Sequence, residues 1–355
     1  MRLNETIRSL LGFFRGTEKS VPALTRGPVD HIVLLDGTMS TLDEGCETNI
    51  GLIYKTLQDC PEAGNLGLYY ESGLQWRDWS MTMSVIEGRG INKQIRRAYG
   101  YLASRYTPGD RIFLLGYSRG AFAVRSLAGV IERVGLLKKE EATVRMIRNA
   151  YRHYSNPTDA ATTRAFRDRF CHASTPIEMV GVFDTVKALG IKAPFVRRWS
   201  KVQHSFHNDA LGQSVRHGFH ALALNETREA FSPLLWRRPA DYAGHMEQVW
   251  FRGTHGDIGG QLNGKKASRP LSNIPLTWML SKISSCNICL PEDWEVRFPT
   301  DASAPSIGPW HGWAKFFWVR RRRVVGVDAS ERLHPTAVGH GFVPSRRGAL
   351  ARTDS

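Results

Sequence analysis

The sequence has no long hydrophobic run. Arg, Lys, Asp or Glu interrupts every stretch that approaches the ~18 to 20 apolar residues needed to span a bilayer, so we expect no membrane-spanning helix. The N-terminal segment also lacks the marks of a secretory signal, because its apolar cluster at residues 10–14 is short and no small-residue cleavage site follows. These absences predict synthesis in the cytoplasm without a cleavable signal peptide.

Cysteine is scarce, with five in 355 residues. An odd number scattered through a large chain argues against a disulfide framework and indicates synthesis in a reducing compartment. Cys286 and Cys289 form a lone C-x-x-C without a second pair or nearby histidine ligands. We therefore predict no zinc site, interpret this pair as a helix end, and expect no metal or other cofactor.

Acidic residues are outnumbered, since 33 Asp and Glu stand against 48 Lys and Arg, a net charge of +15. This charge predicts attraction to phospholipid headgroups or nucleic acid, although the amino-acid usage of the source genome explains it equally well. No zinc-finger or RNA-recognition motif accompanies it, so nucleic acid is the less favoured partner. The hydrophobic share of 42% is that of an ordinary globular chain, which excludes disorder of the whole.

Short apolar runs alternate with helical patterns along the chain. Runs with the length and bounding turns of buried strands occupy residues 31–35, 66–70, 112–115, 178–183 and 248–251. Apolar residues at helical spacing occupy residues 49–57, 91–105, 119–133 and 140–154. Strands that are apolar on both faces and alternate with helices predict an α/β fold with a mostly parallel central sheet and helices on both faces.

We expect three regions along the chain. Residues 30–343 form one α/β domain, and residues 344–355 form a polar, flexible tail. Residues 1–29 form an amphipathic leader that either lies on a membrane surface or docks on the protein's own core. Its apolar side chains fall on one helical face: Leu3, Ile7, Leu10, Leu11 and Phe14.

The most informative segment is Gly116-Tyr-Ser118-Arg-Gly120, which joins an apolar strand to a helix rich in small residues. This G-x-S-x-G pattern is typical of a nucleophile elbow, in which the two glycines remove side chains that would collide with the strand and helix. Ser118 is the candidate nucleophile, and the backbone N–H of Arg119 is a candidate oxyanion donor at the helix N-terminus. The alternative is a purely structural turn.

A serine hydroxyl needs a general base, and that base needs an orienting carboxylate. In α/β-hydrolases these follow along the chain in the order Ser, Asp or Glu, His. Asp184 directly follows the apolar run 178–183, and His255 lies in a glycine-rich loop after the run 248–251. Both positions favour the carboxyl edge of the sheet. Three alternatives stay open: His220, His334 and Asp257.

The loop after the first predicted strand, Asp36-Gly37-Thr38, offers a second oxyanion donor from the backbone N–H of Gly37 or Thr38. Asp36 and Asp257 are candidate supporting residues, and the acidic, glycine-rich loop around Asp257 is suited to a cation. Asp-Gly-Thr also resembles a phosphatase motif whose nucleophilic aspartate lies two residues earlier. Leu34 occupies that position, so an aspartyl-phosphate mechanism has no nucleophile here.

Several segments together resemble a known family. They are Leu35-Asp-Gly-Thr38, Thr48-Asn49, Gly116-Tyr-Ser-Arg-Gly-Ala121, Gly181-Val-Phe-Asp-Thr-Val186, residues 220–228, residues 250–260 and Leu333-His-Pro335. In type and order they resemble the α/β-hydrolase catalytic domain of the type VI secretion phospholipase effectors, over roughly residues 30 to 340. The resemblance implies a serine lipolytic enzyme with a triad on Ser118, Asp184 and His255. It also implies delivery to rival bacteria, with a secretion carrier and an immunity protein as partners.

Two features depart from this family. Asn225 stands where the segment after His220-Ala-Leu-Ala usually carries Asp, and we expect no dedicated membrane-anchoring domain beside the catalytic one. The predicted function is hydrolysis of carboxylic esters in membrane phospholipids by a phospholipase A-type enzyme. A soluble-ester or acyl hydrolase with a non-lipid substrate is the alternative, and a non-enzymatic protein that binds anionic surfaces is the least favoured.

Aromatic and basic residues interleave between Trp310 and Arg323. Tryptophan favours the headgroup level and arginine pairs with phosphate, so this segment predicts peripheral contact with an anionic bilayer. A strand or lid packed on the core with a solvated arginine rim is an equal alternative. Trp76, Trp79 and residues 81–83 are candidates for an acyl pocket or for plain core. We expect the protein to be exported by type VI secretion and to associate with a membrane.

Overall fold

The computed structural model describes residues 26–60, 65–73, 89–156, 159–186, 210–309 and 319–338. Four predictions concern residues outside this part of the chain: those for residues 1–25 of the leader, for residues 76–83, for residues 310–318 and for the tail at residues 344–355. The division of the chain into three regions stays a prediction.

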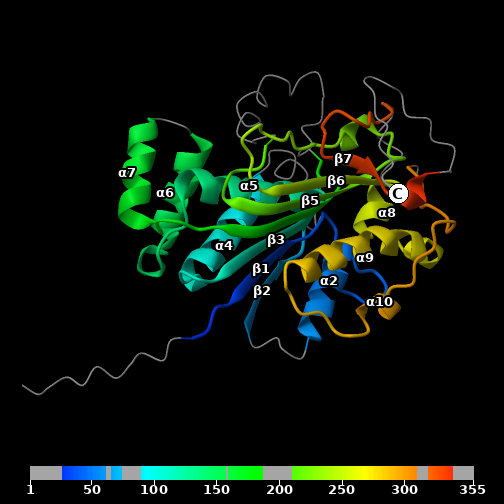
Figure 1. Cartoon of the computed structure of the whole chain (residues 1–355), viewed down its shortest axis with the longest axis horizontal. Coiled ribbons are helices and arrows are strands. Elements are labelled where there is room, and N and C mark those ends of the chain that lie inside the picture. Colours follow the sequence, from blue (N-terminus) through cyan, green and yellow to red (C-terminus); the bar gives the residue numbers. More distant parts are fainter. Residues whose placement is uncertain are drawn as a thin grey trace, which may run out of the picture.

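A seven-stranded sheet forms the centre of the described structure, and every neighbouring pair of strands is parallel. The strands are β1 (Asp30–Leu35), β2 (Leu66–Glu71), β3 (Arg111–Tyr117), β4 (Ile177–Phe183), β5 (Val215–Ala223), β6 (His245–Phe251) and β7 (Glu331–Leu333). Their spatial order is β2-β1-β3-β4-β5-β6-β7 (Figure 1). The predicted α/β class with a parallel central sheet is confirmed.

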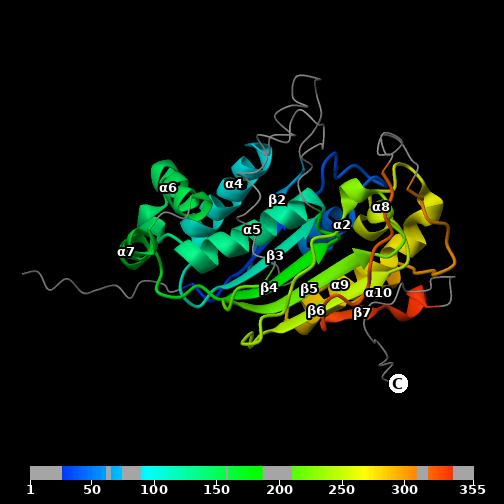
Figure 2. The ribbon, with the colours of Figure 1, turned by 90° about the horizontal axis from the view of Figure 1, so that it is seen from above.

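Helices cover both faces of the sheet. One group is α4 (Arg89–Arg105), α5 (Arg119–Val134), α6 (Val144–Ser155) and α7 (Ala160–Phe170), and the other is α2 (Asn49–Gln58), α8 (His255–Gly259), α9 (Arg269–Ser285) and α10 (Trp294–Arg297). In β1, Val33 and Leu35 pack with the first group, whereas Ile32 and Leu34 pack with the second. The strands are apolar on both faces because both faces are covered, as Figures 1 and 2 show.

All five predicted strands and all four predicted helices are present, with ends that differ by at most four residues. α6 begins at Val144 rather than at residue 140, because the Thr143 side chain caps it and residues 139–141 form a separate 3-10 turn. Cys286 caps the C-terminus of α9, as the C-x-x-C pair predicted. No helix in the described ranges has the length and apolarity to cross a bilayer.

The sequence patterns do not predict β5, β7, α7 or α9. The first half of β5 reads Val-Arg-His-Gly, which interrupts the apolar run, and β7 has three residues. α9 contains Pro275 in its interior, a residue that normally argues against a helix. In each of these elements tertiary packing outweighs the local signal.

The parallel arrangement brings the loops that follow the strands to one edge of the sheet. The loops after β1, β3, β4 and β6 begin at residues 36, 118, 184 and 252. The first residues of two of these loops are hydrogen-bonded to the neighbouring strands, since Ser118 N–H donates to Phe183 O of β4 at 3.0 Å and Asp184 N–H donates to Ala221 O of β5 at 2.7 Å. The carboxyl edge therefore gathers the candidate residues from four strands.

Candidate active site

Ser118 lies on a sharp turn between β3 and α5. Its backbone has φ 56° and ψ −117°, a conformation that residues with a side chain rarely adopt. A Cβ at Gly120 would lie 2.0 Å from Leu35 O, and a Cβ at Gly116 would lie 2.7 Å from the backbone N of Ala121. The two glycines therefore let the strained turn pack against strand and helix, as the G-x-S-x-G pattern indicated.

His255 lies between Ser118 and Asp184. Its Nε2 is 2.8 Å from Ser118 Oγ, and its Nδ1 is 2.6 Å from Asp184 Oδ2. Because a carboxylate only accepts hydrogen bonds, Nδ1 carries the proton and Nε2 is left to accept from the hydroxyl. The rings of Tyr117 and Phe231 pack on the imidazole at centroid distances of 4.9 and 4.8 Å. The three predicted side chains are thus in one hydrogen-bonded chain.

Asp184 is fully buried at the end of β4, with φ 39°. Its Oδ1 accepts from Ala223 N–H at 3.0 Å and from Arg323 Nη1 at 2.5 Å, and its Oδ2 accepts from Arg323 Nη2 at 2.9 Å. Burial alone would raise the pKa of Asp184, but the charge of Arg323 and the hydrogen bonds from His255 and Arg323 outweigh it and hold this pKa well below its usual value. Asp184 is therefore ionised at neutral pH.

Arg323 is a residue of the site that no sequence pattern predicts. The run at residues 320–323 was expected at an anionic surface or as a solvated rim, and Arg321 and Arg322 are exposed. For Arg323 both interpretations are wrong, because it is 8% exposed and contacts Asp184. No periodicity or motif distinguishes one arginine of four, so the sequence holds no signal for this role.

The competing histidines have structural partners. His220 is fully buried in β5, where its Nε2 accepts from Thr185 N–H at 3.1 Å and its Nδ1 lies 3.3 Å from Gln248 Oε1. Burial lowers the pKa of His220 to about 3, so it stays neutral and holds the backbone beside the candidate acid. His334 Nδ1 lies 2.7 Å from Thr336 Oγ1 in a short turn. Neither imidazole has a hydrogen bond to the candidate nucleophile.

Asp257 supports the turn that carries His255. Its buried carboxylate accepts hydrogen bonds from Thr254 N–H at 2.7 Å, from Thr254 Oγ1 at 2.8 Å and from Ile307 N–H at 2.9 Å, and also from Ser306 Oγ. The Thr254 side chain in turn accepts the Asp257 backbone N–H, which completes a capping box at the start of α8. Within the described ranges, no group of three His, Cys, Asp or Glu is placed to hold a metal ion.

His255 is the first residue of α8 rather than part of a loop, and the loop after β5 holds the residues that precede it. Asn225 N–H donates to Gly253 O at 2.9 Å, and Gly253 N–H donates to Asn225 Oδ1 at 2.7 Å. Glu226 accepts the His255 N–H at 3.2 Å and pairs with Arg228 at 2.6 Å. An amide oxygen accepts the Gly253 N–H as a carboxylate would, so Asn in place of Asp loses no contact here.

Of the two backbone N–H groups predicted as oxyanion donors in the loop after β1, one already donates a hydrogen bond within the protein. Gly37 N–H donates to the Asp36 carboxylate at 2.6 Å and is therefore committed. The N–H of Thr38 and that of Arg119 donate no hydrogen bond to any described residue, and Gln261 holds the Thr38 carbonyl at 2.8 Å. Arg119 and Thr38 remain the candidate donors.

Asp36 joins this loop to its neighbours. It is 1% exposed and accepts from Thr48 Oγ1 at 2.6 Å and from the Tyr70 hydroxyl at 2.9 Å, in addition to Gly37. Burial raises the pKa of Asp36 to about 6 despite these hydrogen bonds, which act in the opposite direction. Asp36 thereby ties the end of β1 to α2 and β2.

Asp36→Asn is expected to reduce the dependence of stability on pH. Because the pKa of Asp36 is about 6 in the folded chain against 3.8 ordinarily, its stabilising contribution is full below about pH 4 and is lost as the pH rises through 6. From about pH 4.5 to about pH 7.5 the wild type loses about 2 kcal/mol of unfolding free energy through this group, and the variant does not. Urea unfolding of both proteins at the two pH values measures the difference, and identical pH dependence contradicts the assignment.

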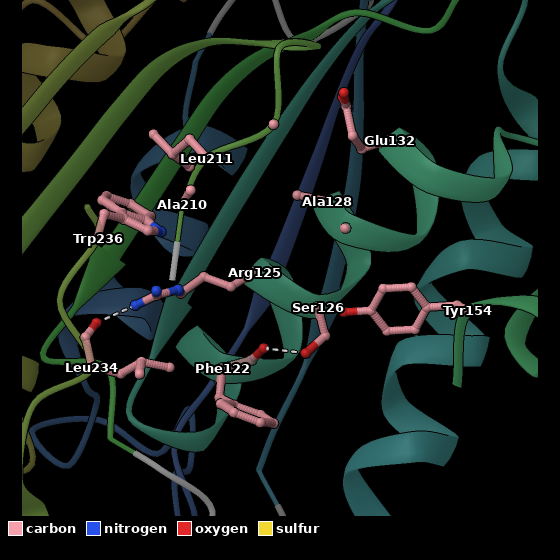
Figure 3. Close-up of a pocket in the computed structure, with 12 residues that line it drawn as sticks. Phe122, Arg125, Ser126, Ala128, Glu132, Tyr154, Ala210, Leu211, Leu234 and Trp236 are labelled. Carbon is pink, nitrogen blue, oxygen red and sulfur yellow. Dashed lines mark hydrogen bonds between the residues drawn. The ribbon is translucent and has the colours of Figure 1, made fainter. Parts of the chain in front are cut away.

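A narrow cavity lies beside α5 (Figure 3). Phe122, Leu234 and Trp236 form part of its wall, and Arg125 lies over the Trp236 ring at 4.9 Å while it donates to Leu234 O. Its volume of about 30 Å³ corresponds to space for only a few water molecules. It has no room for an acyl chain, and none of the three candidate side chains lines it.

Comparison with known proteins identifies relatives of the chain. Residues 30–282 match the family model described as "T6SS, Phospholipase effector Tle1-like, catalytic domain". The Saccharomyces cerevisiae protein described as "Uncharacterized protein YEL023C" is 30% identical over 227 residues, which are 57% of this chain and 32% of the yeast protein. The chain thus spans about a third of that relative's length.

Two solved structures are similar at low identity. An uncharacterized protein from Pseudomonas aeruginosa is 14% identical with a TM-score of 0.39, over 79% of this chain and 52% of that one. The Tle1 effector bound to the VgrG spike of the type 6 secretion system is 16% identical with a TM-score of 0.33, over 66% of this chain and 52% of that one. The family model, in contrast, covers most of the chain and includes Ser118, Asp184 and His255. The chain therefore belongs to the Tle1-like family of type VI secretion phospholipase effectors and carries the catalytic domain of that family.

Proposed function

We propose that this chain is a serine esterase that hydrolyses carboxylic ester bonds of membrane phospholipids, a phospholipase A-type activity, through Ser118, His255 and Asp184. The observation that carries the proposal is the pair of hydrogen bonds made by the His255 ring, 2.8 Å to Ser118 Oγ and 2.6 Å to Asp184 Oδ2. A base between an alcohol and a carboxylate makes a neutral hydroxyl nucleophilic. Membership of the phospholipase family supports the substrate class.

In the proposed mechanism, His255 takes the Ser118 proton as Oγ attacks the ester carbonyl carbon. Asp184 accepts the hydrogen bond from Nδ1 and stabilises the imidazolium. His255 then gives the proton to the leaving lysophospholipid oxygen, which leaves an acyl group on Ser118. Water deprotonated by the same ring releases the fatty acid and restores the serine.

The developing oxyanion is proposed to lie between the N–H groups of Arg119 and Thr38. Arg119 is the first residue of α5, so the partial positive charge of the helix N-terminus adds to its N–H. Thr38 lies in the loop that the hydrogen bonds of Asp36 hold in place, which fixes the position of its N–H. Losing one donor of this kind typically lowers the rate by ~10²- to 10³-fold.

The proposed setting is an anionic bilayer. The net charge of +15 favours anionic headgroups, and Arg321 and Arg322 are exposed on the segment that carries Arg323 to the site. From the family we propose an antibacterial effector that is exported by type VI secretion. A secretion carrier and, in the producing cell, an immunity protein are the proposed partners.

Two measurements on the wild-type chain test the proposal. Liposomes of phosphatidylglycerol with different acyl chains at the two glycerol positions should release one fatty acid and the matching lysophospholipid. A fluorophosphonate probe should label a peptide that contains Ser118, and the control variant Ser281→Ala, which replaces an exposed serine of α9, should keep both activities. Hydrolysis of soluble esters alone supports a non-lipid hydrolase, while binding to liposomes with neither hydrolysis nor labelling contradicts the esterase.

A further inference from the structure

We propose that Arg323 is a positioning residue of this site, which holds the Asp184 carboxylate in a two-pronged ion pair and offsets its negative charge beside the His255 imidazole. The inference rests on the proposed function of Ser118, His255 and Asp184 and adds a fourth side chain to it. Arg323 lies beyond residues 30–282, so the part of the chain matched by the family model does not contain it.

The ion pair has the geometry of a fixed fork. Arg323 Nη1 is 2.5 Å from Asp184 Oδ1, and Nη2 is 2.9 Å from Oδ2. The same two nitrogens donate to Ala223 O at 2.8 Å and to Phe231 O at 2.6 Å. The side chains of Arg323 and Asp184 are 3% and 0% exposed, so water does not screen the pair. One guanidinium thus fixes the acid and the backbone of Phe231, whose ring packs on the imidazole.

Arg323 reaches the site from residues 319–323, here called the strap. The strap runs antiparallel to the loop after β5, with a bridge between Arg320 and Arg228. Glu229 N–H donates to the Val319 carbonyl at 3.0 Å, and Arg321 N–H donates to Thr227 O at 2.7 Å. Because backbone hydrogen bonds anchor the strap, the guanidinium is held at the carboxylate and keeps one orientation.

The charge of Arg323 has a consequence for the imidazole. A lone buried carboxylate favours the imidazolium strongly, whereas a carboxylate already paired with a guanidinium favours it less. The Arg323 guanidinium therefore offsets part of the attraction that the Asp184 carboxylate exerts on a proton of the imidazole. The other titratable and charged groups around the pair are the same with or without Arg323: Asp36, Tyr117, Arg125, His220, Glu226, Arg228 and Asp257.

The pH profile of kcat/KM for a soluble ester separates charge from geometry. In Arg323→Met the acid limb is expected to move up by about one pH unit, and the plateau is expected to fall by roughly 10- to 100-fold. Arg323→Lys keeps the charge but loses the fork, so its plateau falls while its acid limb stays in place. Arg216→Met, which removes an exposed arginine paired with Glu178, is the matched control and leaves both unchanged.

A second readout does not depend on catalysis. With histidine labelled by 15N, NMR follows the titration of the His255 ring, and in Arg323→Met this ring is expected to titrate at higher pH than in the wild type. If the wild type hydrolyses no ester, the proposed function fails, yet the titration still decides the role of Arg323. If the ring titrates at the same pH in folded Arg323→Met as in the wild type, the inference is overturned. If Arg323→Met does not fold, Arg323→Gln is measured in its place. An equal shift in Arg323→Lys also overturns the inference.

Discussion

Ser118→Ala is expected to lower ester hydrolysis by about 10⁴-fold or more and to abolish labelling by a fluorophosphonate. The variant loses the Oγ of the proposed nucleophile, while the proposed oxyanion donors, the N–H groups of Arg119 and Thr38, are retained, so we expect a small residual rate. Folding should be little affected, because alanine keeps the Cβ on the strained turn and the pair between His255 and Asp184 is untouched. Initial rates on liposomes and on a soluble ester measure the loss.

The control for this variant is Ser281→Ala, an exposed serine whose Oγ bonds only within its own helix, to Trp278 O. It should keep the wild-type rate and the label. A thermal midpoint of Ser118→Ala within a few degrees of the wild type shows that lost activity is not lost folding. Turnover by Ser118→Ala at the wild-type rate would remove Ser118 from the mechanism.

Much of the fold follows from local sequence patterns. The strand before Ser118 and the strand before Asp184 are apolar throughout, because both faces of the sheet are covered. Parallel strands then bring their carboxyl ends to one edge, which is why Asp184 and His255 could be found by their position after apolar runs. β5 was not predicted because Arg216, His217 and Gly218 interrupt the apolar pattern of its first half.

The sequence predicts which side chains lie close together, but not which acceptor each hydrogen-bond donor contacts. Gly37 and Thr38 are equivalent as oxyanion donors in the sequence, yet in the structure the Asp36 carboxylate takes the Gly37 N–H. His220 is as plausible a base as His255 by residue type, and only its contacts with Thr185 and Gln248 give it a structural role. Such assignments depend on which acceptor lies within about 3 Å, which no spacing rule supplies.

The strap shows a second limit of reasoning from sequence. Four consecutive arginines predict a solvated or membrane-facing rim, since a charged side chain is rarely buried without a partner. The partner of Arg323 is Asp184, which is 139 residues away along the chain. A contact at that separation is invisible to a local pattern. It follows only from the structure, in which the strap pairs antiparallel with the loop after β5.

Asp184→Asn is expected to lower kcat by roughly 10³- to 10⁴-fold and to destabilise the fold. An asparagine cannot compensate the imidazolium and favours the wrong tautomer of His255, which accounts for the loss of rate. It also leaves the Arg323 guanidinium buried without an anion, which costs about 3 to 5 kcal/mol. Because the pKa of Asp184 is lowered by folding, its contribution is present above about pH 4 and is lost on acidification, so the difference in unfolding free energy from the wild type shrinks at low pH.

The double variant Asp184→Asn with Arg323→Met separates the two losses. It removes both buried charges, so unfolding in urea should show much of the stability restored, while kcat stays as low as in Asp184→Asn. Asp241→Asn, at an exposed carboxylate, controls for the substitution itself and should match the wild type in both measurements. If the double variant were no more stable than Asp184→Asn alone, the unpaired guanidinium would not be the cause of the destabilisation. Wild-type kcat in Asp184→Asn would remove the carboxylate from the proposed mechanism.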